Sequence, residues 1–86
     1  MKLADLDPKL QGTLDDGFVI FDCPFPGHTH RQYVKVHRAP FAKVNGQNTW
    51  EARGEFPDTL SLFPSVNADS PSYPCWHGFI TNGEVT

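Results

Sequence analysis

The stretch that decides the fold is GFVIFDCPFPGHTHRQYVKVH, residues 17–37, in which two apolar runs flank a loop rich in proline and histidine. Residues 17–22 combine aromatic and β-branched side chains, which is typical of a buried strand. In residues 23–27 two prolines fix φ and a glycine permits positive φ, so the chain is expected to turn there. Residues 32–36 return as a second strand. These signals predict a β-hairpin.

Turn signals continue the β pattern towards the C-terminus. Asn45-Gly46 and Asn82-Gly83 are dipeptides that favour tight turns. Short runs beside them, at residues 49–52 and 77–81, are predicted to be strands. Residues 63–66 are expected to cross into a loop, and residues 67–74 are polar and rich in proline, which predicts an exposed loop before the last strand.

Residues 1–16 form an acidic lead-in to the core of residues 17–86. Leucines in the lead-in recur at three- and four-residue steps, which favours a turn or two of helix packed on the core. Pro8 and Gly12 oppose this pattern. The leucines are Leu3, Leu6, Leu10 and Leu14.

The chain has 86 residues and is expected to form one domain. The predicted fold class is mainly β, a compact antiparallel sheet of four to five short strands with long loops rich in proline and glycine. A small α+β arrangement is the alternative. A domain of this size buries only about 60% of the surface of its unfolded chain. Small cores therefore often gain stability from a disulfide, a metal or a partner.

The formal net charge is −3, which argues against binding to nucleic acid, because such binding needs many lysines and arginines. Basic residues are nevertheless concentrated in the segment 31–43, and alternate residues of a strand there would share one face. We interpret this face as solvated and retain it, with the two tryptophans, as a candidate binding surface. That surface comprises Arg31, Tyr33, Lys35, Arg38, Trp50 and Trp76.

No segment approaches the roughly 20 apolar residues of a membrane span. The first residues also lack the apolar run of a signal peptide. We therefore expect a cytoplasmic protein without a membrane partner. Reducing conditions in the cytoplasm disfavour a structural disulfide.

Cysteine and histidine are grouped in two short patches at opposite ends of the chain. Cys23 lies close to His28 and His30, and Cys75 lies close to His77. Zinc prefers thiolate and imidazole ligands in a tetrahedral shell, and two cysteines with two histidines are a common structural set. The pattern predicts one Zn²⁺ that clamps the first hairpin to the last strand, so that binding energy acts as folding energy.

The predicted zinc ligands are Cys23, His30, Cys75 and His77. Cys75 and His77 would point to the same side of a strand, because side chains alternate along it. His30 begins the second predicted strand and is preferred, with His28 as its alternative. Two other interpretations stay open, namely buried thiols without a metal and a disulfide between the two cysteines.

These residues also resemble a small domain family of unknown function that is frequent in phages and prophages and occurs beside bacterial ubiquitin-like systems. Its members are sometimes misnamed ammonia monooxygenase. The family pattern looks like an apolar strand entering Cys-Pro, then Gly and His, a mid-chain Trp, Thr-Leu before Pro-Ser-Val, and Cys-x-His followed by an apolar pair and Gly. The matching stretches here are residues 21–24, 27–30, Trp50, 59–66 and 75–83.

The metal site that the resemblance implies supports a zinc ion in this chain. Many members of the family carry a second cysteine shortly after the first, and Pro26 occupies that place here. A nearby histidine, His30 or His28, is the natural substitute. The resemblance implies no settled activity.

Ser65 and the two tryptophans each allow two interpretations. A serine nucleophile needs a base within hydrogen-bond reach, and His77 is the nearest candidate in the sequence. A metal-bound histidine cannot serve as that base, so we interpret Ser65 as a turn residue. Trp50 and Trp76 are interpreted as hydrophobic core area rather than as a platform for a stacked ligand.

The predicted function is that of a non-enzymatic, zinc-stabilised binding module encoded by a phage or prophage and acting in the host cytoplasm. Its partner would be a host or phage protein, with host defence or nucleic-acid machinery as the target. One alternative is a small zinc-dependent hydrolase whose metal keeps an open position for water. Another is a nucleic-acid-binding module that uses the segment 31–43.

Overall fold

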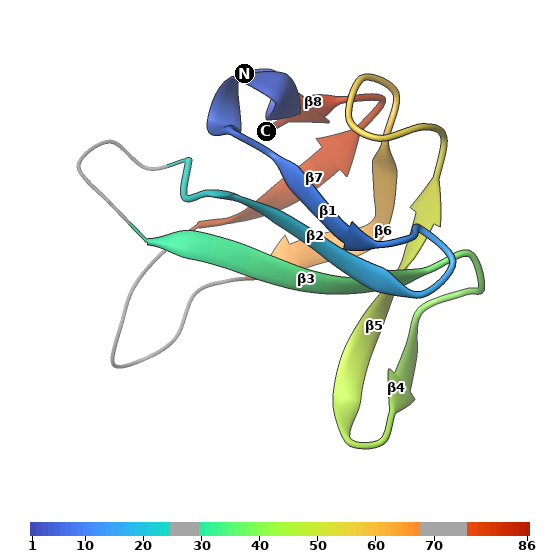
Figure 1. The fold of residues 1–86 in the computed structure, drawn as a ribbon. Coiled ribbons are helices and arrows are strands. Elements are labelled where there is room, and N and C mark those ends of the chain that lie inside the picture. The colour runs from blue at the N-terminus through green and yellow to red at the C-terminus, as the bar shows by residue number, and fades with distance from the viewer. Residues whose placement is uncertain (25–29, 68–75) are drawn as a thin grey trace.

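The computed structural model of the chain describes residues 1–24, 30–67 and 76–86, and these residues form mostly β-strands (Figure 1). A short 3₁₀ helix, η1 (Leu3–Leu6), precedes the strands. The strands are β1 (Lys9–Gly12), β2 (Gly17–Asp22), β3 (Arg31–His37), β4 (Ala42–Val44), β5 (Gln47–Arg53), β6 (Ser61–Asn67), β7 (His77–Thr81) and β8 (Glu84–Val85). No helix in these three ranges is long and apolar enough to cross a membrane.

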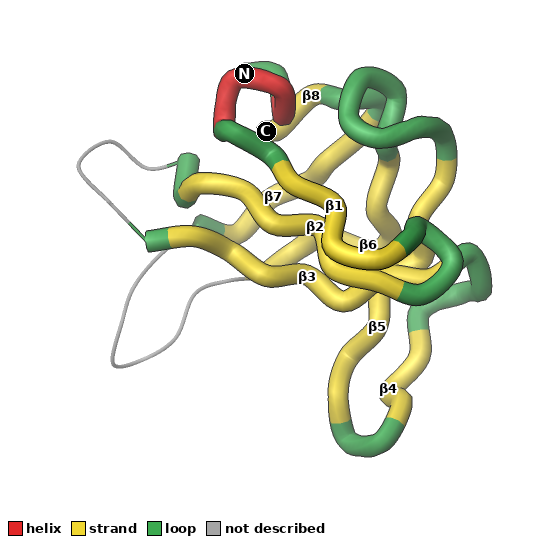
Figure 2. Tube along the Cα trace, viewed as in Figure 1, coloured by secondary structure: helices red, strands yellow, loops and turns green. Residues whose placement is uncertain are grey.

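The strands form one curled sheet that resembles half of a barrel (Figures 1 and 2). Hydrogen-bonded neighbours follow the order β1-β2-β3-β5-β6-β7-β8, and β4 pairs with β5 at the side. The mainly β class is confirmed. The expected four to five antiparallel strands are corrected, for the described residues, to a sheet of 8 strands in which β3 and β5 run parallel. The β4–β5 hairpin explains the parallel pair. The chain reverses direction between β4 and β5, so β5 lies beside β3 and runs in the same direction.

The curled sheet encloses a hydrophobic core and leaves an outer face exposed. Side chains alternate across a strand, and β7 shows this most clearly. Gly78 and Ile80 are buried in β7. His77, Phe79 and Thr81 are exposed on the other side of the same strand. The outer face is therefore free to carry a functional site.

The strongest sequence signals correspond to observed elements. The predicted hairpin is confirmed, because β2 covers residues 17–22 and β3 covers the predicted 32–36 with one more residue at each end. The predicted strand at residues 77–81 is β7. Asn45 and Asn82 have φ angles of 51° and 50°, as the two predicted Asn-Gly turns require.

Two segments differ from the prediction. The leucine-spaced lead-in forms only the short η1 and then extends into β1, because β1 gains a ladder of hydrogen bonds with β2. Residues 63–67 belong to β6 rather than to a loop. Burial of Leu62 and Val66 in the core outweighs the poor strand propensity of Pro64. The rest of the predicted loop, residues 68–74, lies outside the described residues.

Candidate active site

The side chains of Ser65 and His77 meet on the outer face of the sheet. Oγ of Ser65 lies 3.1 Å from Nε2 of His77. Ser65 is half-buried in β6, and His77 is exposed at the start of β7. A hydroxyl group within hydrogen-bond reach of an imidazole is the arrangement that activates serine as a nucleophile.

The register between β6 and β7 brings these two side chains together. Asn67 is the Cα partner of His77, so Ser65, two residues earlier on β6, is diagonal to the imidazole. The register shifts between Leu62 and Val66, which places Ser65 inside an irregular part of the strand. Bulges re-aim side chains and are over-represented next to active sites. The diagonal pair therefore follows from the strand register at the start of β7, and Ser65 lies where that register is interrupted.

A third side chain contacts the backbone of Ser65. Trp50 of β5 donates its indole N–H to the Ser65 carbonyl oxygen at 3.0 Å. The Trp50 ring is half-buried against the core, and Phe41 meets it edge-on with ring centroids 5.3 Å apart. Trp76, the other tryptophan of the candidate binding surface, is only 4% exposed and belongs to the core. Both indoles thus pack inside the protein to a large extent.

Two exposed aromatic side chains border the Ser65–His77 pair, and we call them the aromatic patch. Phe63 precedes Ser65 by two residues on β6 and is 39% exposed. Phe79 follows His77 by two residues on β7 and is 56% exposed. On β7, where side chains alternate regularly, Phe79 shares the exposed face with His77. Arg53 covers the Phe63 ring, with its guanidinium carbon 4.6 Å from the ring centroid.

The predicted zinc ligands are only partly placed together. The backbone N–H of Cys23, a buried residue, donates to the carbonyl oxygen of His30 at 3.0 Å, so these two residues are neighbours. His77 faces Ser65 instead. Cys75 and His28 lie outside the described residues. Within the part of the chain that is described, no three His, Cys, Asp or Glu side chains are grouped as a metal site requires.

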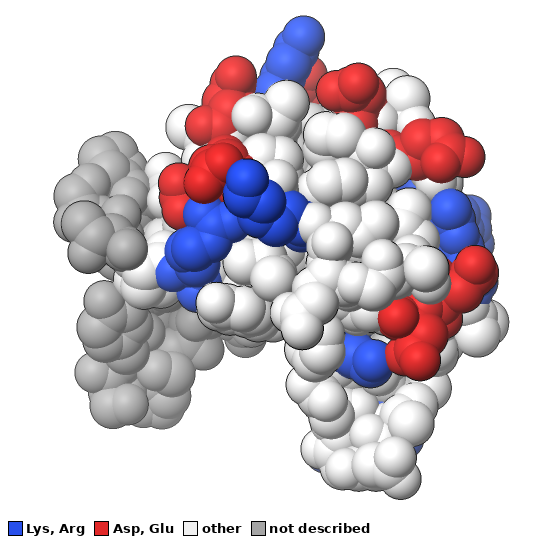
Figure 3. All heavy atoms as spheres, viewed as in Figure 1, with Lys and Arg blue, Asp and Glu red and all other residues white. Residues whose placement is uncertain are grey.

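The predicted basic face is interleaved with acidic side chains (Figure 3). Nη1 of Arg31 lies 2.6 Å from a carboxylate oxygen of Asp22, and Nζ of Lys35 lies 2.7 Å from one of Asp16. The hydrogen bond and the charge of Lys35 hold the pKa of the Asp16 carboxyl below its usual range. Arg38 donates to backbone carbonyl oxygens. These cations are therefore engaged within the protein, which weakens the case for a phosphate-binding stripe.

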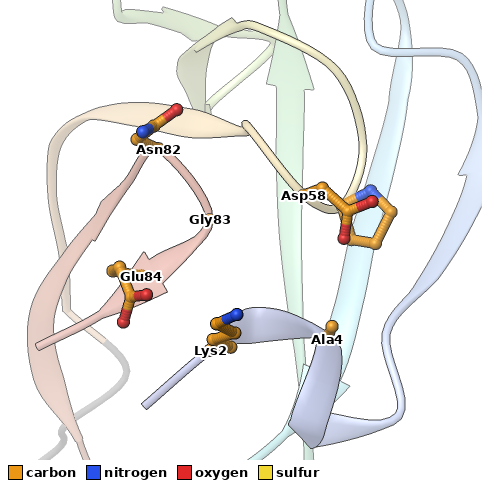
Figure 4. A pocket seen from close by; sticks show the side chains of 7 residues that line it. Lys2, Ala4, Asp58, Asn82, Gly83 and Glu84 are labelled. Atoms are coloured by element: carbon orange, nitrogen blue, oxygen red, sulfur yellow. The ribbon is translucent and has the colours of Figure 1, made fainter.

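A polar pocket lies at the opposite end of β7 from the Ser65–His77 pair (Figure 4). His77 begins β7, whereas the Asn82-Gly83 turn that lines the pocket follows the strand. The pocket is lined by Lys2, Ala4, Pro57, Asp58, Asn82, Gly83 and Glu84. The candidate active site is thus an open surface on the sheet and does not lie in this pocket.

Fold and site together define a small β protein with a serine–histidine pair of the kind that serine hydrolases use. Residues 4–86 match the model of a family described as bacterial ubiquitination-like system serine protease (BubE). The match spans nearly the whole chain, and the chain belongs to this family. No curated protein and no solved structure matches the chain.

The family corrects the function predicted from the sequence. A non-enzymatic binding module that acts through protein–protein interaction is wrong, because the family is described as a serine protease. The zinc hydrolase and the nucleic-acid-binding module are wrong for the same reason. The description as a metal-binding protein of unknown function is also corrected, by the family and by the missing ligand group in the described ranges. The interpretation of His77 as a zinc ligand had left Ser65 without a candidate base.

Ser65 is the candidate nucleophile that the sequence interpretation set aside. The alternation of residues 77–81 is a signal that could have placed His77 on the solvent side of this strand, where the structure has it exposed. The position of Ser65 on the adjacent strand gave no such signal, because residues 63–67 were expected in a loop. Only the observed register between β6 and β7 joins the two residues.

Proposed function

We propose that this chain is a serine protease of a bacterial ubiquitination-like system, with Ser65 as the nucleophile and His77 as the general base. The observation that carries the proposal is the 3.1 Å contact between Oγ of Ser65 and Nε2 of His77 in a member of this family. The substrate is a protein of that system, with its ubiquitin-like modifier as the expected acyl donor. The cytoplasmic location expected from the sequence remains part of the proposal.

The two side chains provide the nucleophile and the general base for acyl transfer. Oγ of Ser65 attacks the scissile carbonyl carbon while Nε2 of His77 takes the hydroxyl proton. The tetrahedral intermediate then breaks its bond to the leaving amine, to which His77 returns that proton. Water attacks the acyl-serine ester with His77 again as base, and this step releases the carboxylic acid and restores Ser65.

The surroundings of the pair suit a protein substrate. His77 is exposed, and the site lies on the outer face of the sheet rather than in the polar pocket. The aromatic patch beside the pair offers apolar area that a bound chain can cover. A folded modifier could therefore present its C-terminal segment across β6 and β7.

The proposal removes His77 from the predicted zinc ligands. A metal on Nε2 would occupy the lone pair that accepts the serine proton. A metal on Nδ1 would leave the proton on Nε2, so that this nitrogen could only donate to Oγ. Either mode abolishes general-base catalysis by His77.

The direct test is cleavage of the ubiquitin-like protein of the same system. The ubiquitin-like protein is incubated with the purified chain in two forms. One form carries a C-terminal extension, and the other is conjugated to a target protein. Wild type is expected to cleave at least one form. Ser65→Ala is expected to lower the rate by roughly 10³-fold or more, since the nucleophile is lost.

Ser61→Ala is the matched control, because Ser61 lies on the same strand and its hydroxyl accepts the backbone N–H of Asn82 at 2.8 Å instead of facing His77. It is expected to keep the wild-type rate. Equal activity of wild type and Ser65→Ala would show that the proposed nucleophile is wrong. Inactivity of wild type towards both forms would reject the proposed substrate.

A further inference from the structure

The hydrogen bond between Trp50 and Ser65 lies where the backbone ladder around Ser65 is weakest. On the β5 side, the antiparallel register pairs Arg53 with Ser61 at one end and Glu51 with Phe63 at the other. Continued by one step, this register would place Trp50 opposite Pro64, which has no N–H to donate. On the β7 side, the register is interrupted over the same stretch of β6.

We infer that Trp50 is a positioning residue for the nucleophile, an inference that rests on the proposed function. Its indole N–H donates to the Ser65 carbonyl oxygen at 3.0 Å and so pairs a backbone acceptor of β6 beside the point where the regular pairing with β5 ends. The bond fixes the backbone of Ser65 within the irregular stretch of β6. The direction of Oγ towards His77 depends on that backbone.

Trp50 is itself held on two sides, as a positioning residue must be. Its backbone is in the parallel ladder, where Val36 is its Cα partner. Its ring packs against the core and meets Phe41 edge-on, with an interplanar angle of 79°. An indole anchored in this way transmits the rigidity of β3 and β5 to Ser65. Trp50 does not touch the reacting atoms, so its effect on catalysis is indirect.

The test compares Trp50→Phe, which keeps an aromatic ring but removes the N–H donor, with wild type. A fluorophosphonate probe labels the activated serine, and its concentration dependence separates the maximal labelling rate from the apparent binding constant. Trp50→Phe is expected to lower the maximal rate about 10-fold or more. The apparent binding constant should stay within about 2-fold of wild type, because the probe does not contact the indole.

Phe41→Leu is the control, since it loosens the packing of the same indole but retains its N–H. Its maximal labelling rate is expected to stay closer to wild type than that of Trp50→Phe. Thermal unfolding of each variant corrects the rates for the folded fraction. A second measurement uses wild type alone, where the Trp50 indole proton should be protected from solvent exchange by NMR.

The outcomes separate this inference from the proposed function. A labelled wild type with an equally reactive Trp50→Phe overturns the role of Trp50 and leaves the Ser65–His77 pair intact. A wild type that is not labelled at Ser65 overturns the proposed function itself. If Trp50→Phe does not fold, a rapidly exchanging Trp50 indole proton in wild type overturns the inference, and a protected proton supports it.

Discussion

Ser65 and His77 are 12 positions apart in the sequence, and their side chains meet because β6 and β7 place them diagonally on one face of the sheet. Neither residue is buried, so the contact is available to a substrate. In the neutral tautomer that carries its proton on Nδ1, Nε2 of His77 is the nitrogen that accepts the serine proton. The chemistry of the chain therefore depends on the register of two short strands.

Replacement of His77 by Gln should remove the base and keep a polar side chain at the start of β7. We expect the cleavage rate to fall by about 10³-fold or more, with little loss of stability, because the side chain is exposed. His37→Gln is the control, as His37 lies on β3 with its Nε2 3.0 Å from the carbonyl oxygen of Pro40. The role of His77 would be refuted by equal rates for the two variants in the same cleavage assay.

Replacement of Phe79 by Ser should weaken substrate binding without changing the chemical step. Phe79 is exposed beside His77, and a substrate that covers its ring gains apolar contact. We expect KM to rise roughly 10-fold while kcat changes little. Tyr33→Ser, at an exposed aromatic residue on β3, is the matched control and should leave both constants unchanged. A fall in kcat with unchanged KM would contradict a binding role for the aromatic patch.

Replacement of Gly78 by Ala should destabilise the strand that carries His77. A Cβ atom at this position would meet the carbonyl oxygen of Thr86 and lie 2.7 Å from the indole nitrogen of Trp76. We expect a loss of about 3 kcal/mol in the free energy of unfolding, measured with urea. Gly46→Ala is the control, because a Cβ atom at Gly46 would have no other atom within 4 Å. This substitution adds only the strain of a side chain at positive φ, about 1 kcal/mol. Equal losses would show that the close approach at Gly78 is relieved by movement of its neighbours.

The zinc prediction has its own test, which also separates metal binding from catalysis. Metal analysis of the purified chain gives the zinc content of wild type, Cys23→Ser and His77→Gln. If the chain holds zinc, we expect Cys23→Ser to lose it and His77→Gln to retain it, because His77 serves Ser65. Loss of zinc from His77→Gln with retained protease activity in wild type would contradict the base role of His77. A wild type without zinc would end the prediction of a metal.

The fold was predictable where local signals were strong. The apolar run in residues 17–22 and the Asn-Gly turns gave β2 and both tight turns, because their side chains restrict the backbone locally. The parallel pair of β3 and β5 was not predictable, since it depends on which edge the β4–β5 hairpin meets. β6 was not predicted because Pro64 has a poor strand propensity. In the structure, burial of Leu62 and Val66 stabilises the strand in spite of Pro64.

The site was less predictable than the fold. Ser65 and His77 are both visible in the sequence, but their contact depends on the register between β6 and β7, which no local pattern encodes. The grouping of cysteine and histidine suggested a metal, and that interpretation competed for the same imidazole. The role proposed for Trp50 required the positions of β3, β5, β6 and β7 at once.

The most direct test of the account is identification of the residue that a fluorophosphonate probe modifies. The purified chain is labelled to completion, its intact mass is measured, and the modified peptide is sequenced by mass spectrometry. We predict one adduct per chain, on Oγ of Ser65, which is absent in Ser65→Ala and strongly slowed in His77→Gln. An adduct on another residue, or labelling of Ser65 that is equally fast without the imidazole, would contradict the account.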